Sequence, residues 1–312
     1  MLKAATLLYG RLRAPDLDLQ EEFLSHFGMR RAARTRKALY MRGSGPVHHI
    51  HVTELGPTKT VGIAFAAPDA ESLERASRIA GASPIEAIDE PGGGRRVRLT
   101  DPNGYQVEIV HGMQALDPLP VRENAVNTAA EIRRVGTLTR LRKGPSHVRR
   151  LGHAVFATPK LEETVAWYRR NLGMLGSDEV YAGDRSNIIL SFNRCDRGDV
   201  HTDHHSLMCL KKDYTGLNHL AYEVEDKDDL FIGHEHLKGV AKYRHMWGLG
   251  RHVLGSQCFD YWSDPFGRVH EHWTDIDLLN AETPTNLLSA EEGLGSQWGE
   301  PAPERFINHY NP

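Results

Sequence analysis

Three residues in the second half of the chain have the types and the local surroundings of metal ligands. Eleven of the 18 histidines lie between His153 and His272, inclusive. His153 and His219 each stand in a short apolar segment after a glycine, and Glu271 follows an Asp-Pro-Phe-Gly turn. Two imidazoles and one carboxylate form a donor set that suits ferrous iron and leaves coordination positions open for a substrate and dioxygen. We therefore interpret His153, His219 and Glu271 as the ligands of one divalent metal ion.

Three segments of the first half of the chain recur, in the same order, in the second half. The most distinctive is an Asp-Pro-X-Gly turn followed by a short strand with a glutamate at the same offset, in residues 101–108 and 264–271. The other matches pair residues 15–29 with 159–174 and residues 62–69 with 219–226. Three matches in one order indicate that a domain has been duplicated.

This repeat supplies an internal control for the metal-site interpretation. In the first copy, the positions that correspond to the three candidate ligands hold Tyr9, Gly62 and Glu108. The turn and the strand are kept there, whereas both imidazoles are missing. Packing alone would not confine the histidines to one copy, so we expect a metal-free first copy and about one iron per chain in the second copy.

The periodicity of apolar residues predicts the elements that must position these side chains. Helical spacing predicts helices over residues 161–172 and 230–237. Short apolar, β-rich segments bounded by Gly or Pro predict strands over residues 151–157, 205–210, 217–224 and 268–273. Each copy then contains two βαβββ modules, four in the chain, which predicts an α+β fold.

The repeats and the composition of the intervening segments divide the chain into four parts. We expect a metal-free N-terminal domain over residues 1–115, a linker over 116–149, a catalytic domain over 150–280 and an extended C-terminal strap over 281–312. A short helix is predicted in the linker, around residues 129–134. The tail is assigned as a strap because it is rich in Pro, Gly, Ser and Glu.

Composition excludes several classes of protein. Hydrophobic residues make up 40% and charged residues 25%, which fits a globular protein with a sizeable core. A net charge of -3 argues against a broad basic face for nucleic acid. No apolar run approaches the roughly 20 residues of a membrane helix, and the three cysteines lack CxxC spacing. We therefore expect a cytoplasmic enzyme with no nucleic-acid or membrane partner.

The three candidate ligands stand in motifs that resemble those of a known enzyme family. Leu151-Gly152-His153, Gly216-Leu217-Asn218-His219 and Asp264-Pro265-X-Gly267-X-X-X-Glu271 are similar to the ligand motifs of the type I extradiol ring-cleavage dioxygenases. That family belongs to the vicinal-oxygen-chelate (glyoxalase/bleomycin-resistance) superfamily. The resemblance covers roughly residues 1–280, in the family's two-domain form with a silent N-terminal half. The residues from 250 to 261 and from 270 to 273 further resemble the trihydroxytoluene oxygenase-like branch.

The resemblance implies a fold, a cofactor and partners. The fold would consist of two repeated domains with curved mixed sheets, and the cofactor would be Fe²⁺, with Mn²⁺ as the alternative. The substrates would be dioxygen and a small aromatic diol or triol, and the family implies a homo-oligomer. Two departures, Gly255 at a position that is often acidic and a polar segment over residues 185–203, leave the identity of the ring open.

Three further residues match functional positions of the family. Asp203-His204-His205-Ser206 is similar to the segment whose second histidine, here His205, lies beside the dioxygen site. His252 and Tyr261 precede Glu271 by the family's spacing. The resemblance implies that His205 is a general acid, that His252 hydrogen-bonds the deprotonated substrate oxygen, and that Tyr261 lies next to the scissile bond.

Strand alternation adds a prediction about the surroundings of His205. If this segment is a regular strand, Leu207 and Cys209 share the face of His205, and His204 points to the opposite face. His48, His49 and His51 form the main competing histidine cluster. No third type of ligand is evident near them, so we interpret them as surface residues or as lining of a substrate channel.

Other functions fit parts of the same pattern. A metal-dependent isomerase or thiol transferase similar to glyoxalase I would lack the additional histidines and the tyrosine. An enzyme similar to hydroxyphenylpyruvate dioxygenase would keep the ligands but act on a 2-oxo acid. A non-catalytic ligand-binding protein would have lost the ligand set in both copies. We favour an iron(II)-dependent extradiol dioxygenase of aromatic-compound catabolism, which opens a ring adjacent to its vicinal hydroxyls.

Overall fold

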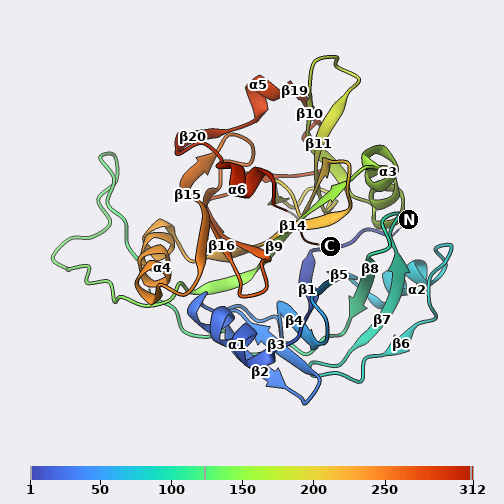
Figure 1. The fold of residues 1–312 in the computed structure, drawn as a ribbon, viewed down its shortest axis with the longest axis horizontal. Coiled ribbons are helices and arrows are strands. Elements are labelled where there is room, and N and C mark those ends of the chain that lie inside the picture. Colours follow the sequence, from blue (N-terminus) through green and yellow to red (C-terminus); the bar gives the residue numbers. More distant parts are fainter. Residues whose placement is uncertain (1, 123, 310, 312) are drawn as a thin grey trace.

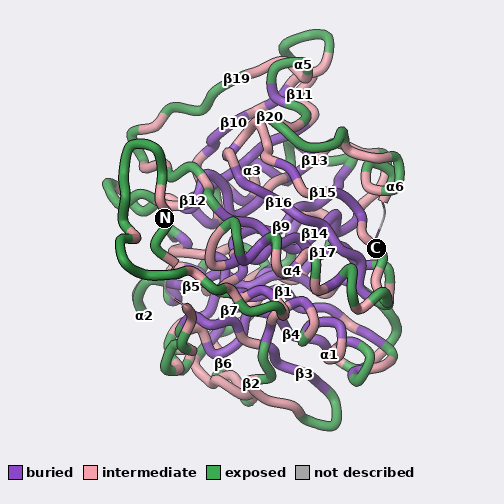
Figure 2. Tube along the Cα trace, turned by 90° about the vertical axis from the view of Figure 1, so that its left-hand side faces the viewer, coloured by how far each residue is buried: buried purple, intermediate pink, exposed green. Residues whose placement is uncertain are grey.

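The computed structural model describes residues 2–122, 124–309 and 311 of the chain. Two curved mixed sheets lie next to each other, one from each half of the chain, and helices α1 to α4 lie on the outside (Figure 1). Buried residues are concentrated in the central strands of both sheets (Figure 2). No helix of the described residues has the length and apolar character needed to cross a membrane.

The N-terminal sheet contains two βαβββ modules. The first consists of β1 (Leu7–Ala14), α1 (Leu17–His26), β2 (Arg30–Arg34), β3 (Ala38–Arg42) and β4 (His51–Leu55). The second consists of β5 (Lys59–Ala66), α2 (Ala70–Ser77), β6 (Glu86–Ala87), β7 (Arg95–Thr100) and β8 (Gln106–His111). The strand order is β2-β3-β4-β1-β5-β8-β7-β6, so the modules meet where β1 pairs with β5.

The C-terminal sheet repeats this arrangement. Its first module consists of β9 (Val148–Thr158), α3 (Leu161–Leu172), β10 (Leu175–Tyr181), β11 (Ile188–Arg194) and β13 (Leu207–Lys211). Its second module consists of β14 (Gly216–Val224), α4 (Lys227–Val240), β15 (Arg244–His252), β16 (Cys258–Ser263) and β17 (Val269–Thr274). The order β10-β11-β13-β9-β14-β17-β16-β15 follows the first sheet strand by strand. The predicted α+β fold with four βαβββ modules is confirmed.

Local sequence explains the boundaries of the two helices of the second copy. Helix α3 buries Leu161, Tyr168 and Leu172 at helical spacing, and it ends at Gly173, whose φ of 67° forms a left-handed cap. Helix α4 begins after Asp226, whose carboxylate accepts a hydrogen bond from a backbone N–H of the first turn. Both helices form where apolar spacing predicts them, and α4 extends beyond the predicted range at both ends.

The C-terminal segment adds strands to both edges of the second sheet. Strand β19 (Asn286–Ser289) pairs with β10, and β20 (Ser296–Gly299) pairs with β15. The short helices α5 (Ala290–Gly293) and α6 (Glu304–Ile307) follow β19 and β20, and β18 (Leu278–Leu279) pairs with β12 (Thr202–Asp203). The segment has more regular structure than an extended strap, because the edge strands offer unpaired backbone groups to it.

The linker between the copies does not form the predicted helix. Among its described residues, those from 129 to 134 are in bends and irregular structure. The side-chain oxygen of Asn127 accepts hydrogen bonds from the backbone N–H groups of Arg133 and Arg134, at 3.0 and 2.7 Å. This side chain competes with helical hydrogen bonding and favours a loop.

The two copies share a buried interface. The ring of Phe27 stacks on that of His272, with 3.7 Å between centroids. His51 Nδ1 lies 2.8 Å from the hydroxyl of Tyr222, and Arg268 donates to the carbonyl of Arg13 at 2.7 Å. His51 is fully buried in this interface, so the predicted surface or channel location is wrong for it. His48 and His49 are also buried, so the predicted surface location is wrong for them as well. The N-terminal copy thereby supports the strands that follow the Asp-Pro-Phe-Gly turn.

Candidate functional site

Three adjacent central strands carry the three candidate ligands. His153 is on β9, His219 on β14 and Glu271 on β17. Because β14 lies between the other two strands, Ala221 is opposite both His153 and Glu271 in the sheet register. His219 is two residues before Ala221 and points to the same face. The topology therefore brings together residues that are far apart in the sequence.

The donor atoms of these side chains converge. His153 Nε2 lies 3.0 Å from Glu271 Oε2, and His219 Nε2 lies 3.2 Å from the same oxygen. One donor atom from each residue lies within 4.8 Å of both others. All three side chains are buried. The spacing suits three ligands of one ion.

Two unpaired polar atoms test whether this group fits a metal. Among the described residues, Glu271 Oε1 has no hydrogen-bond partner, and His219 Nε2, although 3.2 Å from Glu271 Oε2, makes no hydrogen bond of suitable geometry. Buried polar atoms are nearly always paired, and leaving one unpaired costs about 1–3 kcal/mol. A divalent cation would satisfy both atoms. The donor set therefore fits a metal ion.

Protonation states in the site agree with metal binding. Burial opposes ionisation of Glu271, but the neighbouring imidazoles, that of His153 above all, together hold its carboxyl pKa well below the ordinary value. Burial also lowers the pKa of His153, which favours a neutral imidazole. An ionised carboxylate and a neutral imidazole are the forms that bind metals.

Neighbouring amides orient the two imidazoles. Asn218 Oδ1 lies 2.7 Å from His219 Nδ1, and the amide of Gln257 lies 3.4 Å from His153 Nδ1. Donation from Nδ1–H to Asn218 leaves the lone pair of His219 on Nε2, the atom that faces Glu271. Asn218 and His219 are neighbours in β14, and a bulge of this strand between Leu217 and His219 allows their side chains to contact each other. Motif comparison placed Asn218 beside a ligand but did not predict this contact, and it missed Gln257.

His205 lies beside the candidate ligands. Its ring centroid is 4.2 Å from that of His153, and the residue is 3% exposed. His205 Nδ1 lies 3.0 Å from His204 Nδ1, and His204 Nε2 lies 2.7 Å from Asp178 Oδ2. His204 therefore contacts His205 instead of pointing to the opposite face. Sequence analysis missed this link from His205 to a carboxylate.

The predicted surroundings of His205 are wrong. Leu207 and Cys209 belong to the main hydrophobic core, whereas Met208 and Leu210 line the cavity next to His205. The reason is that β13 begins only at Leu207, so His205 precedes the strand and period-two alternation does not reach it.

His252 on β15 and Tyr261 on β16 lie next to Glu271. His252 Nε2 lies 2.8 Å from the hydroxyl of Tyr261 and 3.7 Å from Glu271 Oε1. Tyr261 is opposite Glu271 in the pairing of β16 with β17. Burial, followed by the Glu271 charge, raises the pKa of Tyr261 well above its ordinary value, so the phenol is neutral. The structure thus brings all six predicted site residues together.

A cavity of about 390 Å³ opens above these residues. Five of the six site residues line it, while Glu271 lies beneath them. Most other walls are apolar, and the C-terminal segment supplies several of them. The apolar lining residues include Leu190, Phe192, Met208, Leu210, Trp247, Leu254, Leu294, Phe306 and Ile307. Sequence analysis did not predict that the C-terminal segment closes the cavity, because its spacing carries no repeat signal.

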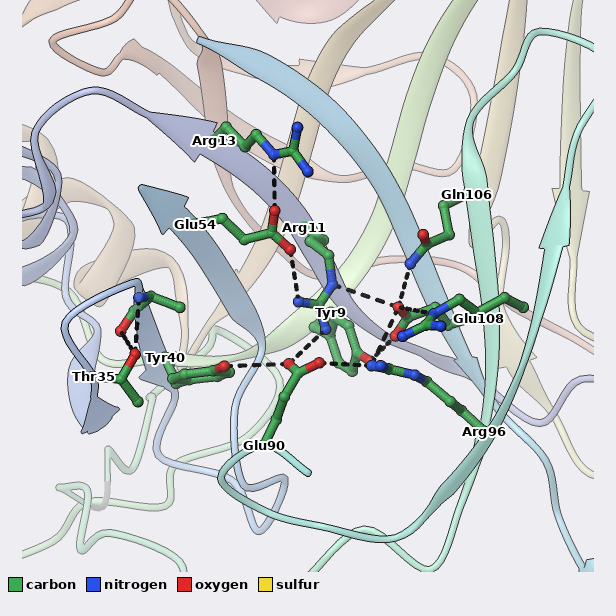
Figure 3. Close-up of polar contacts among 12 residues, drawn as sticks. Tyr9, Arg11, Arg13, Thr35, Tyr40, Glu54, Glu90, Arg96, Gln106 and Glu108 are labelled. Carbon is green, nitrogen blue, oxygen red and sulfur yellow. Dashed lines mark hydrogen bonds and ion pairs between the residues drawn. The ribbon is translucent and has the colours of Figure 1, made fainter. Parts of the chain in front are cut away.

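Ion pairs close the corresponding position of the N-terminal copy (Figure 3). In the strand register, Tyr9 and Glu108 both lie opposite Ala64. His153 and Glu271 lie opposite Ala221 in the same way. The Tyr9 hydroxyl donates to Glu108, and Arg11 and Arg96 place guanidinium nitrogens 3.6 and 3.5 Å from its Oε1. The guanidinium groups thus balance the charge of Glu108 in the first copy. A metal ion would balance the charge of the corresponding carboxylate, Glu271, in the second copy.

Backbone packing also prevents restoration of a ligand set in the first copy. A Cβ at Gly62 would overlap the carbonyl oxygen of Gln106. We expect the double variant Tyr9→His/Gly62→His to lose about 1–3 kcal/mol of stability or more through overpacking, without binding additional iron. Thermal unfolding and elemental analysis measure both effects. Gly239→His is the matched control, because its Cβ would meet no atom within 4 Å. A second iron per chain in the double variant would contradict the prediction.

Comparison with known proteins finds similarity to this chain both in sequence and in structure. No protein-family model matches the sequence. The chain is 30% identical over 311 residues to Metapyrocatechase 2 from Cupriavidus necator, which covers 96% of this chain and 90% of that protein.

The structural matches extend along both copies. Homoprotocatechuate 2,3-dioxygenase from Brevibacterium fuscum, in an anaerobic complex with 3,4-dihydroxyphenylacetate, has a TM-score of 0.81 at 18% identity and covers 100% of this chain and 94% of its own. The Mn(II)-bound glyoxalase from Novosphingobium aromaticivorans has a TM-score of 0.79 at 22% identity. The match covers 98% of this chain and 94% of the glyoxalase chain. At these identities, the matches demonstrate a shared fold.

Sequence and fold lead to the same family. Metapyrocatechase 2 is similar along nearly the whole chain, which includes the first copy as well as the second copy with the candidate ligand set. The shared fold accounts for the strand order of both sheets. The chain belongs to the extradiol, meta-cleaving ring-opening dioxygenases of the vicinal-oxygen-chelate superfamily.

Proposed function

We propose that this protein is an iron(II)-dependent dioxygenase that uses O₂ to open a catechol-type or trihydroxylated aromatic ring adjacent to its vicinal hydroxyls. The observation that carries the proposal is the convergence of two groups on one cavity. One group is the ligand set His153, His219 and Glu271, and the other is the set His205, His252 and Tyr261. Glyoxalase I-like isomerases and thiol transferases would not need the second group.

His153, His219 and Glu271 would hold the metal. Fe²⁺ supplies Lewis acidity and electron transfer to dioxygen, and two neutral imidazoles with one carboxylate leave it a net charge of about +1. A catechol monoanion would neutralise that charge. Mn²⁺ accepts the same donor set, so reconstitution with each metal separately decides between them.

His252 and Tyr261 would bind and orient the substrate hydroxyls. Their polar atoms lie 2.8 Å apart in the wall of the cavity, and His252 also lies near Glu271. A neutral phenol donates a hydrogen bond to a substrate oxygen, and the imidazole can hold the proton that leaves the diol. Both residues are on strands, which gives the pair a fixed orientation.

His205 would deliver a proton during cleavage. It is buried beside His153 of β9, whereas Tyr261 is on β16, which β14 and β17 separate from β9 in the sheet. Contact with His204, which in turn contacts Asp178, holds the imidazole in place.

The cavity suggests a ring with an apolar substituent. About 150 Å³ suffices for benzene, whereas this cavity holds about 390 Å³. Lys212 is the one Lys or Arg among the described residues that line it. We therefore propose an apolar extension of the diol ring, with Lys212 able to accept a carboxylate at the end of that extension. The trihydroxytoluene oxygenase-like branch, the homo-oligomer and the cytoplasmic location stay predictions.

Anaerobic titration followed by oxygenation tests the proposal. The iron-loaded enzyme is titrated with catechol, with alkyl- and aryl-substituted catechols and with carboxyalkyl catechols, and oxygen uptake and product absorbance are then recorded. We expect tight binding of substituted diols, and one O₂ consumed per ring opened. Absence of oxygen uptake with every diol and triol, or turnover of a 2-oxo acid instead, would refute the proposal.

A further inference from the structure

A second group of two imidazoles and one carboxylate lies outside the cavity. His234 is on α4, His245 on β15 and Asp260 on β16. One donor atom from each lies within 4.8 Å of both others. Asp260 precedes Tyr261, and successive strand residues point to opposite faces, so this group lies behind the wall of the cavity. The proposed ring cleavage uses none of these three residues.

The geometry resembles that of the first ligand set. His234 Nδ1 lies 3.1 Å from both carboxylate oxygens of Asp260, and His245 Nε2 lies 2.8 Å from Oδ1. The corresponding distances to Glu271 Oε2 are 3.0 and 3.2 Å. Donor atoms that bind one zinc ion tetrahedrally at about 2.0–2.1 Å lie roughly 3.4 Å apart. Small rotations of these side chains would therefore separate the donor atoms enough for all three to bind one ion.

The carboxylate is oriented as a ligand. The indole N–H of Trp262 donates to Asp260 Oδ2 at 2.5 Å, and both histidines have a ring nitrogen within 3.1 Å of Oδ1. Such a hydrogen bond from a neighbouring residue is typical of metal-binding carboxylates. Trp262 is itself buried, so it holds Asp260 in a fixed position.

Charge balance also calls for a cation at this place. Asp260 has no exposed surface, and no Lys or Arg of the described residues pairs with it. A buried carboxylate between neutral imidazoles lacks a compensating positive charge, which is costly. Either a metal ion or a protonated histidine must supply it.

We propose that His234, His245 and Asp260 bind a zinc ion. Two nitrogens and one oxygen suit Zn²⁺, with water as the fourth ligand. The side chains of His234 and His245 are 12% and 26% exposed, so the ion and its water reach the site from solvent. The ion would connect α4 with β15 and β16, the strands that carry His252 and Tyr261. Its role would be to hold the wall of the cavity in place.

The experiment counts zinc in a chain whose first site is disabled. Glu271→Ala is stripped with chelator, titrated with ZnSO₄ in equilibrium dialysis and measured by elemental analysis. We expect about one zinc per chain, and a rise in Tm of roughly 4 °C at a free zinc concentration a hundredfold above Kd. His234→Ala and His245→Gln, each added to Glu271→Ala, should lose both effects. His236→Ala, on the same helix, is the control and should keep them.

The outcomes separate the two sources of positive charge. Zinc that disappears in both ligand variants and stays in the control supports the site. Zinc bound equally by all variants, or none bound by Glu271→Ala at micromolar free zinc, would overturn it and leave a protonated histidine as the partner of Asp260. Two different ligand variants guard against one that misfolds, which circular dichroism would reveal. The experiment measures zinc content and Tm, and neither iron content nor ring cleavage, so the result does not depend on the proposed function.

Discussion

Glu271→Ala should lose its bound iron and its ring-cleaving activity together. Glu271 supplies the single carboxylate of the ligand set, and its Oε2 is the atom on which both imidazoles converge. Without it, two neutral imidazoles remain, and they neither balance the charge of Fe²⁺ nor complete its coordination. Iron content by elemental analysis should fall from about one per chain to near zero, and oxygen uptake with a catechol should fall to background.

Glu108→Ala is the matched control in the N-terminal copy. Glu108 occupies the corresponding strand position, but Tyr9, Arg11 and Arg96 surround it in place of histidines. We expect unchanged iron content and nearly unchanged turnover, with a lower Tm, because guanidinium groups lose a buried partner. Iron retained in Glu271→Ala, two irons per wild-type chain, or full activity with zinc alone would contradict the assignment.

His205→Asn and His205→Phe should separate proton transfer from metal binding. His205 contacts His153 ring to ring, but it contributes no atom to the converging donor set. We therefore expect iron content and catechol affinity close to those of the wild type. Turnover should fall by roughly 10²–10⁴, the usual contribution of a positioned acid or base. Rapid-mixing absorbance is the suitable measurement, since a slowed proton transfer lengthens the life of an oxygenated species.

Comparison with Tyr261→Phe sharpens this test. The Tyr261 hydroxyl hydrogen-bonds His252, and we propose that it contacts the substrate without donating the decisive proton. Its removal should therefore lower turnover less than either change at His205. Iron lost in proportion to activity would make His205 a ligand, and unchanged turnover would remove it from the mechanism.

The sequence alone predicted the repeat, the α+β fold and the residues that gather at the site. These features are local: the Asp-Pro-X-Gly turn, the offset of Glu271 from it, and the short apolar segment around His153 depend on neighbours within a few residues. A duplicated chain also repeats its strand order, so Tyr9 and Gly62 at the positions that correspond to His153 and His219 predicted that the second copy is the one that binds the metal.

Only the tertiary structure decided the contacts between distant segments. Alternation failed at His205 because the start of β13 depends on its pairing with β11 and β9. The link from His204 to Asp178 and the closure of the cavity by the C-terminal segment depend on strands added across the sheet. Arg11 and Arg96 meet Glu108 only because β1, β7 and β8 lie near one another in the sheet. Periodicity encodes which face a side chain occupies, whereas the partner on that face is determined by long-range packing.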